Sequence, residues 1–327
     1  MRRADGEIKL IDKWVCRIVR AWFSAVGRLP ATARERCATF LGRLLYALAG
    51  QRRRITLDNL RRAYGPAKST ADIESTARRV FENCSRMIFE IGWALRLREA
   101  EFPGHFKIRG ASDYEKAMAK GRGALMLIAH FGNWELLPIV ARMLRMPIHI
   151  VYRPMDLDGL DLFFRQNRTR FGGSTIPVRR GAMQKIYRAL RAGCPVGMLM
   201  DQGADWYDGV FVDFFNRRAA TNTGMAILAL KTKAPVVPIF LIRRPRGFEA
   251  VFGPELPLIS TGDYTKDLEA NTQLYNKVIE TYARKFTDQW FWIHHRWKNR
   301  PYCPWPRRTI RKGRKRRHIG LNTVEIT

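Results

Sequence analysis

The pattern of apolar positions divides the chain into two regions with different periods. Between about residues 8 and 100, apolar residues recur at spacings of three and four, as in amphipathic helices. From about residue 106, short apolar runs alternate with helical patterns instead. The expected strands are 124–129, 148–152, 196–200, 236–242 and 249–252, and the expected helices are 113–120, 136–145, 160–171, 183–191 and 223–232. This alternation predicts an α/β fold in which a central mixed sheet is flanked by helices.

We therefore expect three regions along the chain: a helical region over 1–105, an α/β domain over 106–300 and a tail over 301–327. The tail carries clusters of arginine and lysine after several prolines, which is typical of a flexible, solvated polycation. The sequence contains no internal repeat and no glycine-rich loop of the kinds that cradle phosphates.

The first helical pattern leaves two interpretations open. Its apolar positions include two tryptophans, and basic residues fall between them: the apolar set is Ile8, Ile11, Trp14, Val15, Ile18, Val19, Trp22 and Phe23, and the basic set is Lys9, Lys13, Arg17 and Arg20. Such a helix can pack on the domain as an ordinary surface helix, or it can lie on a membrane. Its charges interrupt the apolar run well before the roughly 20 residues that span a bilayer, and the start lacks a signal-peptide pattern. We expect peripheral membrane association of this region.

The balance of charges points to an anionic partner. The chain has 59 lysines and arginines against 29 aspartates and glutamates, for a net charge of +30. A charge of this size favours either nucleic acid or the anionic face of a membrane. The sequence has no recognised nucleic-acid-binding module, so nucleic acid is not expected. The five cysteines are scattered and form no C-x-x-C pair, which predicts no metal site and no disulfide framework, and favours a reducing compartment.

A histidine and a carboxylate stand five residues apart at the end of the first expected strand. His130 follows the buried run, Gly132 stands in the turn, and Glu135 opens the next helical pattern. This spacing can place an imidazole beside the carboxylate that orients it, which would make His130 a base for a hydroxyl nucleophile. A structural histidine at a strand end is the alternative. Glu135 could also be a first-turn carboxylate at the positive end of the helix dipole, a role compatible with orienting His130.

Polar residues at the ends of other expected strands extend the candidate site. Arg153 follows the second expected strand, where it could hold a phosphate or an oxyanion, or could be an ordinary surface arginine. Asp201 and Gln202 follow the third, at the edge where α/β sheets usually bind ligands. Two further candidates for substrate binding are Arg180, before an expected helix, and Asn133, in the turn after the first strand.

Taken in order, these elements resemble the bacterial late acyltransferases of lipid A biosynthesis, the lauroyl- and myristoyltransferase family, within the wider group of glycerolipid and lysophospholipid acyltransferases. The resemblance covers most of the chain, and an H-x4-[D/E] pattern alone would be far less specific than the ordered series 54–60, 130–135, 151–154, 201–202, 209–224, 235–238 and 289–298. The resemblance implies that His130 and Glu135 form the catalytic pair and that Arg153 is the basic residue of the substrate site. Asp201 and Gln202 match a further motif of the family.

The resemblance also implies a reaction. A fatty acyl chain would pass from an acyl carrier protein thioester to a hydroxyl of a lipid A precursor, an anionic glycolipid, on the cytoplasmic face of the bacterial inner membrane. A lysophospholipid, an aminolipid or a mannolipid acceptor, and an acyl-CoA donor, are the alternatives. No serine or cysteine stands in a nucleophile motif, so we expect direct transfer without an acyl-enzyme, and no cofactor. Members of the family commonly carry an N-terminal membrane anchor, from which the charge-punctuated first helix departs.

Overall fold

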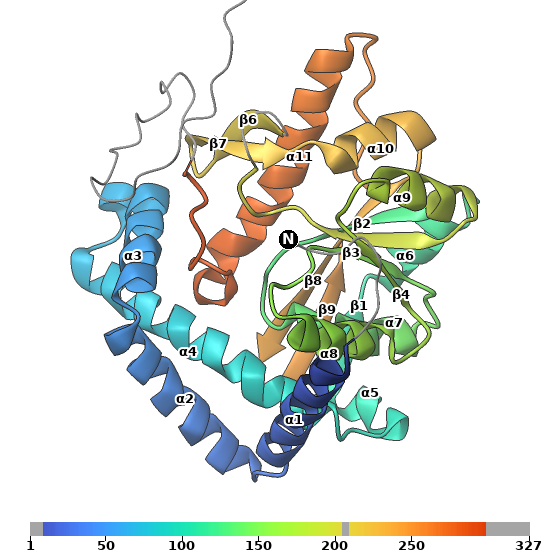
Figure 1. The fold of residues 1–327 in the computed structure, drawn as a ribbon. Helices are drawn as coiled ribbons and strands as arrows, with labels where there is room; N and C mark the ends of the chain where they lie inside the picture. Colours follow the sequence, from blue (N-terminus) through green and yellow to red (C-terminus); the bar gives the residue numbers. More distant parts are fainter. Residues whose placement is uncertain (1–8, 205–208, 299–327) are drawn as a thin grey trace, which may run out of the picture.

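The computed structural model describes residues 9–204 and 209–298 and is built around a seven-stranded sheet (Figure 1). The strand order is β1-β9-β8-β2-β5-β3-β4. β8 runs antiparallel to β9, and the other neighbouring strands are parallel, which confirms the predicted mixed sheet. The strands are β1 (Phe106–Arg109), β2 (Ala124–Ile128), β3 (His149–Tyr152), β4 (Ser174–Pro177), β5 (Pro195–Leu199), β8 (Val236–Arg244) and β9 (Gly247–Phe252).

Helices cover both faces of this sheet. One face, here called the α8 face, carries α6 (Ala111–Met118), α7 (Leu137–Met143) and α8 (Asp158–Thr169). The other, called the α9 face, carries α9 (Ala182–Arg191), α10 (Gly224–Thr232) and α11 (Tyr264–Lys285). Successive side chains of β2 point to opposite faces: Met126 and Ile128 join the core of the α8 face, and Leu125 and Leu127 join that of the α9 face. Because both faces are covered, β2 is a continuous apolar run instead of an alternating one.

Four helices precede the sheet: α1 (Leu10–Gly27), α2 (Ala31–Leu48), α3 (Gly50–Tyr64) and α4 (Thr70–Ala94), and the short α5 (Phe102–His105) leads into β1. Figure 1 shows α1 beside α8, and α2 along α4. Phe23 of α1 stacks on Phe163 of α8, with ring centroids 4.8 Å apart. Gly27 and Gly92 let α1 and α4 touch, because a Cβ on Gly27 would lie 2.1 Å from the carbonyl oxygen of Gly92.

The outer sides of α1 and α2 leave large apolar side chains in solvent. These residues are 37% to 73% exposed and comprise Leu10, Ile11, Trp14, Ile18 and Trp22 on α1, and Phe40, Leu44, Leu45 and Leu48 on α2. The first helix therefore packs on the domain through one side, as one interpretation predicted, while its tryptophans stay exposed. In the described part of the chain, no helix is long and apolar enough to cross a membrane.

The apolar pattern missed several elements. β1 and β4 are strands of only four residues, and the hairpin of β6 (Gly209–Phe214) and β7 (Arg217–Asn222) turns through Phe215 and Asn216, both with positive φ. Such a two-residue turn usually signals itself by a glycine, which is absent here. The long helix α11 escaped detection because buried polar residues interrupt its apolar stripe: Asp267, Asn271, Asn276 and Glu280. The predicted basic tail lies outside the described residues.

Candidate active site

Three neighbouring strands bring the predicted residues to one edge of the sheet. β2, β5 and β3 lie side by side and run parallel, so their carboxyl ends meet. His130 follows β2, Asp201 and Gln202 follow β5, and Arg153 follows β3. The carboxyl edge of a parallel sheet is where α/β proteins bind their ligands. The sequence prediction placed these residues at strand ends, and the structure confirms that placement.

Asp201 is the carboxylate that binds the imidazole of His130. Oδ1 of Asp201 lies 2.8 Å from Nδ1 of His130, and Oδ2 accepts the backbone N–H of the same histidine at 3.0 Å. Burial alone would raise the pKa of Asp201, but the charge of His130 and its hydrogen bonds outweigh burial and lower that pKa to about 2. Asp201 is therefore a buried, ionised carboxylate in contact with the histidine.

A carboxyl-terminal segment braces this pair. Nε1 of Trp290 donates a hydrogen bond of 2.8 Å to Oδ2 of Asp201, and Trp290 is 1% exposed. The same segment bonds to the turn: the carbonyl of His130 accepts from the backbone N–H of Phe291 at 3.0 Å, and Gly132 donates to the carbonyl of Gln289 at 2.9 Å. Gly132 has a φ of +57°, and a Cβ there would lie 2.1 Å from the carbonyl oxygen of Leu241, so only glycine fits.

The second ring nitrogen of His130 faces the cavity. Nε2 lies 3.2 Å from the side-chain nitrogen of Gln202. Because an ionised carboxylate only accepts hydrogen bonds, Nδ1 carries a proton toward Asp201, and in the neutral ring Nε2 is the basic nitrogen. The amide of Gln202 can donate to that nitrogen. The histidine is thus held in the tautomer that a general base requires.

Glu135 does not take the position that the five-residue spacing suggested. It lies in a short 3-10 turn, Trp134–Leu136, and its carboxylate binds Arg168 of α8 through both oxygens, at 2.9 Å from Nε and 2.5 Å from a terminal nitrogen. Both side chains are nearly buried. Among the residues that the structure describes, the hydrogen-bond partners of the His130 ring are Asp201 and Gln202. The direct histidine–glutamate contact expected from the sequence is therefore not formed, because Arg168 engages both oxygens of the glutamate.

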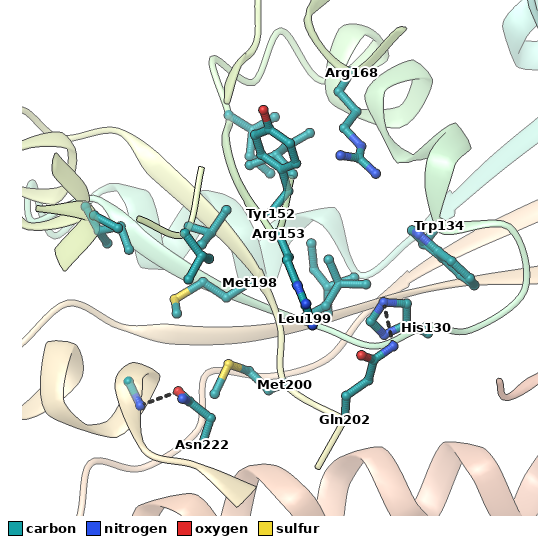
Figure 2. A pocket seen from close by; sticks show the side chains of 18 of the residues that line it. His130, Trp134, Tyr152, Arg153, Arg168, Met198, Leu199, Met200, Gln202 and Asn222 are labelled. Atoms are coloured by element: carbon teal, nitrogen blue, oxygen red, sulfur yellow. Dashed lines mark hydrogen bonds between the residues drawn. The ribbon is translucent and has the colours of Figure 1, made fainter. Parts of the chain in front are cut away.

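A cavity of about 740 Å³ opens beside His130 (Figure 2). Four of the predicted residues line it, namely His130, Glu135, Arg153 and Gln202. Figure 2 shows Trp134 and Gln202 near His130, and Met198, Met200 and Asn222 on the opposite side of the view. The walls are mostly apolar, and their cations are Arg153, Arg168 and Arg179. A mostly apolar cavity with a few placed polar groups is typical of a binding site for a ligand with a hydrocarbon part.

Two predicted substrate-binding residues lie away from this cavity. Asn133 is fully buried and donates to Glu90 at 2.9 Å and to the carbonyl of Met87 at 3.2 Å, which ties the His130 turn to α4. Arg180 is exposed and is not among the lining residues, whereas its neighbour Arg179 is. Asp201 reaches the cavity only through His130. Sequence reasoning missed Arg168 and the role of Trp290.

Comparisons with known proteins agree with the chemistry of this cavity. The family model described as bacterial lipid A biosynthesis acyltransferase matches residues 2–299. The chain is similar to a lipid A biosynthesis lauroyltransferase of Escherichia coli, with 27% identity over 281 residues, 84% of this chain and 89% of the relative. It is also similar to a lipid A biosynthesis palmitoleoyltransferase of that organism, with 25% identity over 269 residues, 80% and 85% of the two chains. A phosphatidylinositol mannoside acyltransferase of Mycolicibacterium smegmatis is 25% identical over 184 residues, 55% and 59% of the two chains.

Proposed function

Because the chain belongs to the bacterial lipid A biosynthesis acyltransferase family and is an enzyme of acyl transfer to lipid, we propose a specific reaction for it. A fatty acyl chain passes from an acyl carrier protein thioester to a hydroxyl of a lipid A precursor. The observation that supports this proposal best is the contact between His130 and Asp201, which leaves Nε2 of the histidine facing a largely apolar cavity.

In this mechanism His130 is the general base. Its Nε2 takes the proton of the acceptor hydroxyl while the hydroxyl oxygen attacks the thioester carbonyl. Nδ1–H stays on its hydrogen bond to Asp201, whose negative charge stabilises the imidazolium that forms. When the tetrahedral intermediate collapses, the carbon–sulfur bond breaks and the imidazolium returns the proton to the thiolate. The products are the new ester and the free thiol of the carrier.

The cavity arginines have different tasks in this proposal. Arg168 is neutralised by Glu135, so this pair forms part of the wall. Arg153 lines the cavity, its side chain is exposed, and among the described residues no carboxylate pairs with it. We assign it to an anion, either the oxyanion of the intermediate or a phosphate of the acceptor. Glu135 thus acts on the site through Arg168, and Asp201 orients the base.

We place the protein at the cytoplasmic face of the inner membrane, and the exposed apolar side chains of α1 and α2 support contact with a membrane surface. Trp14, Ile18 and Trp22 lie along α1 together with Arg17 and Arg20, the pairing of aromatic and basic groups that favours an anionic bilayer surface. In a flotation assay with anionic vesicles, an Ile18→Asp/Trp22→Asp variant should lose binding relative to wild type. Unchanged flotation of the folded variant would remove α1 from the proposed membrane contact.

The reaction is tested with purified protein, acyl carrier protein or CoA thioesters, and a panel of acceptors. We expect transfer to a lipid A precursor, abolished by His130→Ala and retained by His149→Ala, a histidine at the start of β3 outside the cavity lining. Wild-type rates in the folded His130→Ala variant would refute the assigned base. Transfer to a mannolipid, a lysophospholipid or an aminolipid in place of the lipid A precursor would refute the proposed acceptor, and preference for acyl-CoA would refute the proposed donor.

A further inference from the structure

The cavity passes between two strands of the sheet. β3 and β5 are paired at His149 with Val196 and at Ile150 with Gly197. Beyond these pairs, β5 continues beside β2 as far as Leu199, and β3 continues beside β4 as far as Tyr152. The two strands therefore separate toward their carboxyl ends. The residues on both sides of the gap line the cavity, including Val151 and Tyr152 of β3 and Met198 and Leu199 of β5.

As a result, the cavity has an apolar wall on each face of the sheet. The wall on the α8 face includes Ile128, Leu137, Ile148, Ile150 and Leu199. The wall on the α9 face includes Val151, Ala182, Ile186, Met198 and Met200. The polar groups of the cavity that follow the strands, His130, Arg153 and Gln202, stand at the carboxyl ends between these two walls. The reacting centre is thus flanked by two hydrocarbon surfaces.

We propose that the two walls bind two different hydrocarbon chains at the same time. The wall on the α8 face takes the chain that is transferred, and the wall on the α9 face takes a chain that the acceptor already carries. This inference rests on the proposed function and specifies where each lipid lies. A methylene fills roughly the volume of one water molecule, on the order of 30 Å³, so one chain of about twelve carbons leaves about half of the 740 Å³ cavity for a second chain.

The α8 face is the closed side. Ile128 and Ile148, which line it, are 4% and 8% exposed, and β-branched side chains have few rotamers with which to adapt. From Ile148, directly before β3, to Tyr152 at its end, the chain rises roughly 13 Å at about 3.3 Å per residue, a depth that suits a medium-length acyl chain. The wall of fixed shape and depth is the one that can select the length of the chain.

The α9 face is the open and adaptable side. Its inner residues, such as Ile186 and Met200, are as buried as Ile128 and Ile148, but Met183 and Val178 also line the cavity and are 40% and 56% exposed, so this side reaches the surface. Met183, Met198 and Met200 offer flexible thioethers that accommodate chains of different shape. An acceptor whose headgroup remains outside the cavity can enter from this side.

Gly197 of β5 leaves space for a hydrocarbon chain at the inner end of the wall on the α8 face. A Cβ at this position would lie 2.9 Å from Cδ1 of Ile128 and 3.2 Å from Cδ1 of Ile148, so both side chains would have to move. Both are buried residues that line the cavity, so a shift of either side chain changes the shape of this wall. A side chain at 197 therefore shortens the closed side, and truncation of Ile148 lengthens it. We assign Gly197 and Ile148 as residues that determine the length of the transferred chain.

The experiment compares donor thioesters of increasing chain length with acceptors that carry a short or a long chain. Gly197→Ala should lower the rate ratio of long to short donors at least tenfold, the size expected for methylenes that no longer fit a pocket. Ile148→Ala should raise the same ratio. Ile227→Phe, which reduces the space on the side of α10, should instead discriminate against long-chain acceptors and leave the donor ratio as in wild type.

Binding of free fatty acids, measured by thermal shift in a His130→Ala background, separates this inference from the proposed reaction. The chain length that stabilises the protein most should shorten with Gly197→Ala and lengthen with Ile148→Ala, whether or not transfer is observed. A donor ratio and a fatty-acid optimum that stay at wild-type values in both variants, with both variants folded, would overturn the assignment. A change of donor ratio in Ile227→Phe would overturn it as well. Absence of transfer in the wild type would instead refute the proposed function.

Discussion

Replacement of Asp201 by asparagine is the sharpest test of the assigned base. Asp201 accepts three N–H donors: Nδ1 and the backbone N–H of His130, and Nε1 of Trp290. Asparagine has the same shape but only one accepting oxygen. Two of the donors converge on Oδ2, so the oxygen of asparagine should take that place and its NH₂ group should face Nδ1 of His130. The imidazole then accepts at Nδ1 and carries its proton on Nε2, where it can no longer take one.

The size of the effect follows from this change of tautomer. We expect kcat to fall roughly 10²- to 10⁴-fold, the range that general-base catalysis contributes, and toward the upper end because the ring is held in the wrong tautomer. KM for the donor should change little, since Asp201 reaches the cavity only through His130. Asp213→Asn, a change of an exposed aspartate on β6, is the matched control.

Asp201→Asn should also change the dependence of stability on pH. The pKa of Asp201 in the folded protein, about 2, lies below its ordinary value of 3.8. The carboxylate therefore contributes on the order of 2 kcal/mol to the free energy of unfolding. This contribution is present above pH 3.8 and is lost as the pH falls through about 2. Denaturant unfolding from neutral to acidic pH should show this contribution in wild type and not in the variant. A folded Asp201→Asn enzyme with wild-type kcat would refute the assigned orientation of His130.

Four further predictions concern the neighbours of the site and the order of the reaction. Trp290→Phe keeps an aromatic side chain but replaces the indole with a phenyl ring and so removes the N–H on Asp201. The rate constant kcat should fall about tenfold at unchanged KM, the effect of one hydrogen bond to a charged group; wild-type kinetics would exclude a positioning role. Glu135→Gln should destabilise the protein by roughly 3–5 kcal/mol in denaturant unfolding because it leaves Arg168 buried without its partner, and adding Arg168→Gln should restore part of that loss. Burial lowers the pKa of His294 from 6.5 to about 4. The stability that neutral His294 contributes is therefore present above pH 6.5 and is lost as the pH falls through about 4. In His294→Phe, the free energy of unfolding should depend less on pH between these two values. Initial rates with both substrates varied should give the intersecting pattern of a ternary complex, and a parallel pattern together with a labelled acyl-enzyme would contradict direct transfer.

The edge of the sheet that holds the site could be predicted from the sequence, and the partners within the site could not. Apolar runs of five or six residues mark buried strands, so His130, Arg153 and Asp201 could each be assigned to a strand end. Which strands become neighbours depends on the whole fold: β5 lies between β2 and β3, although β3 precedes β5 in the chain. This order brings Asp201 to His130 across 71 residues, while Glu135, only five residues away, is bound by Arg168.

Local register and buried polar contacts explain the other differences between the site predicted from the sequence and the site in the structure. Arg179 lines the cavity and Arg180 does not, a difference of one residue in the loop after β4 that no periodicity reports. Asn133 stands in the turn that follows His130, yet its side chain points into the protein toward Glu90 of α4. Trp290 falls in the 289–298 segment that carries the family resemblance, but its N–H bond to Asp201 appears only in the structure. Such contacts are formed between distant segments and carry no local signal.

The groups around Nε2 of His130 relate the proposed direct transfer to the two walls of the cavity. Among the described residues that line the cavity, the side chains with a hydroxyl or thiol are Tyr152 and Thr223, and Nε2 of His130 is bound by neither; its partner is the amide of Gln202. In the proposed reaction, the proton that His130 takes therefore comes from the acceptor and not from either of these side chains. The acceptor hydroxyl must then reach Nε2 while the thioester is already in place. In this mechanism two lipids occupy the cavity together, and the gap between β3 and β5, with an apolar wall on each face, would give each lipid its own surface.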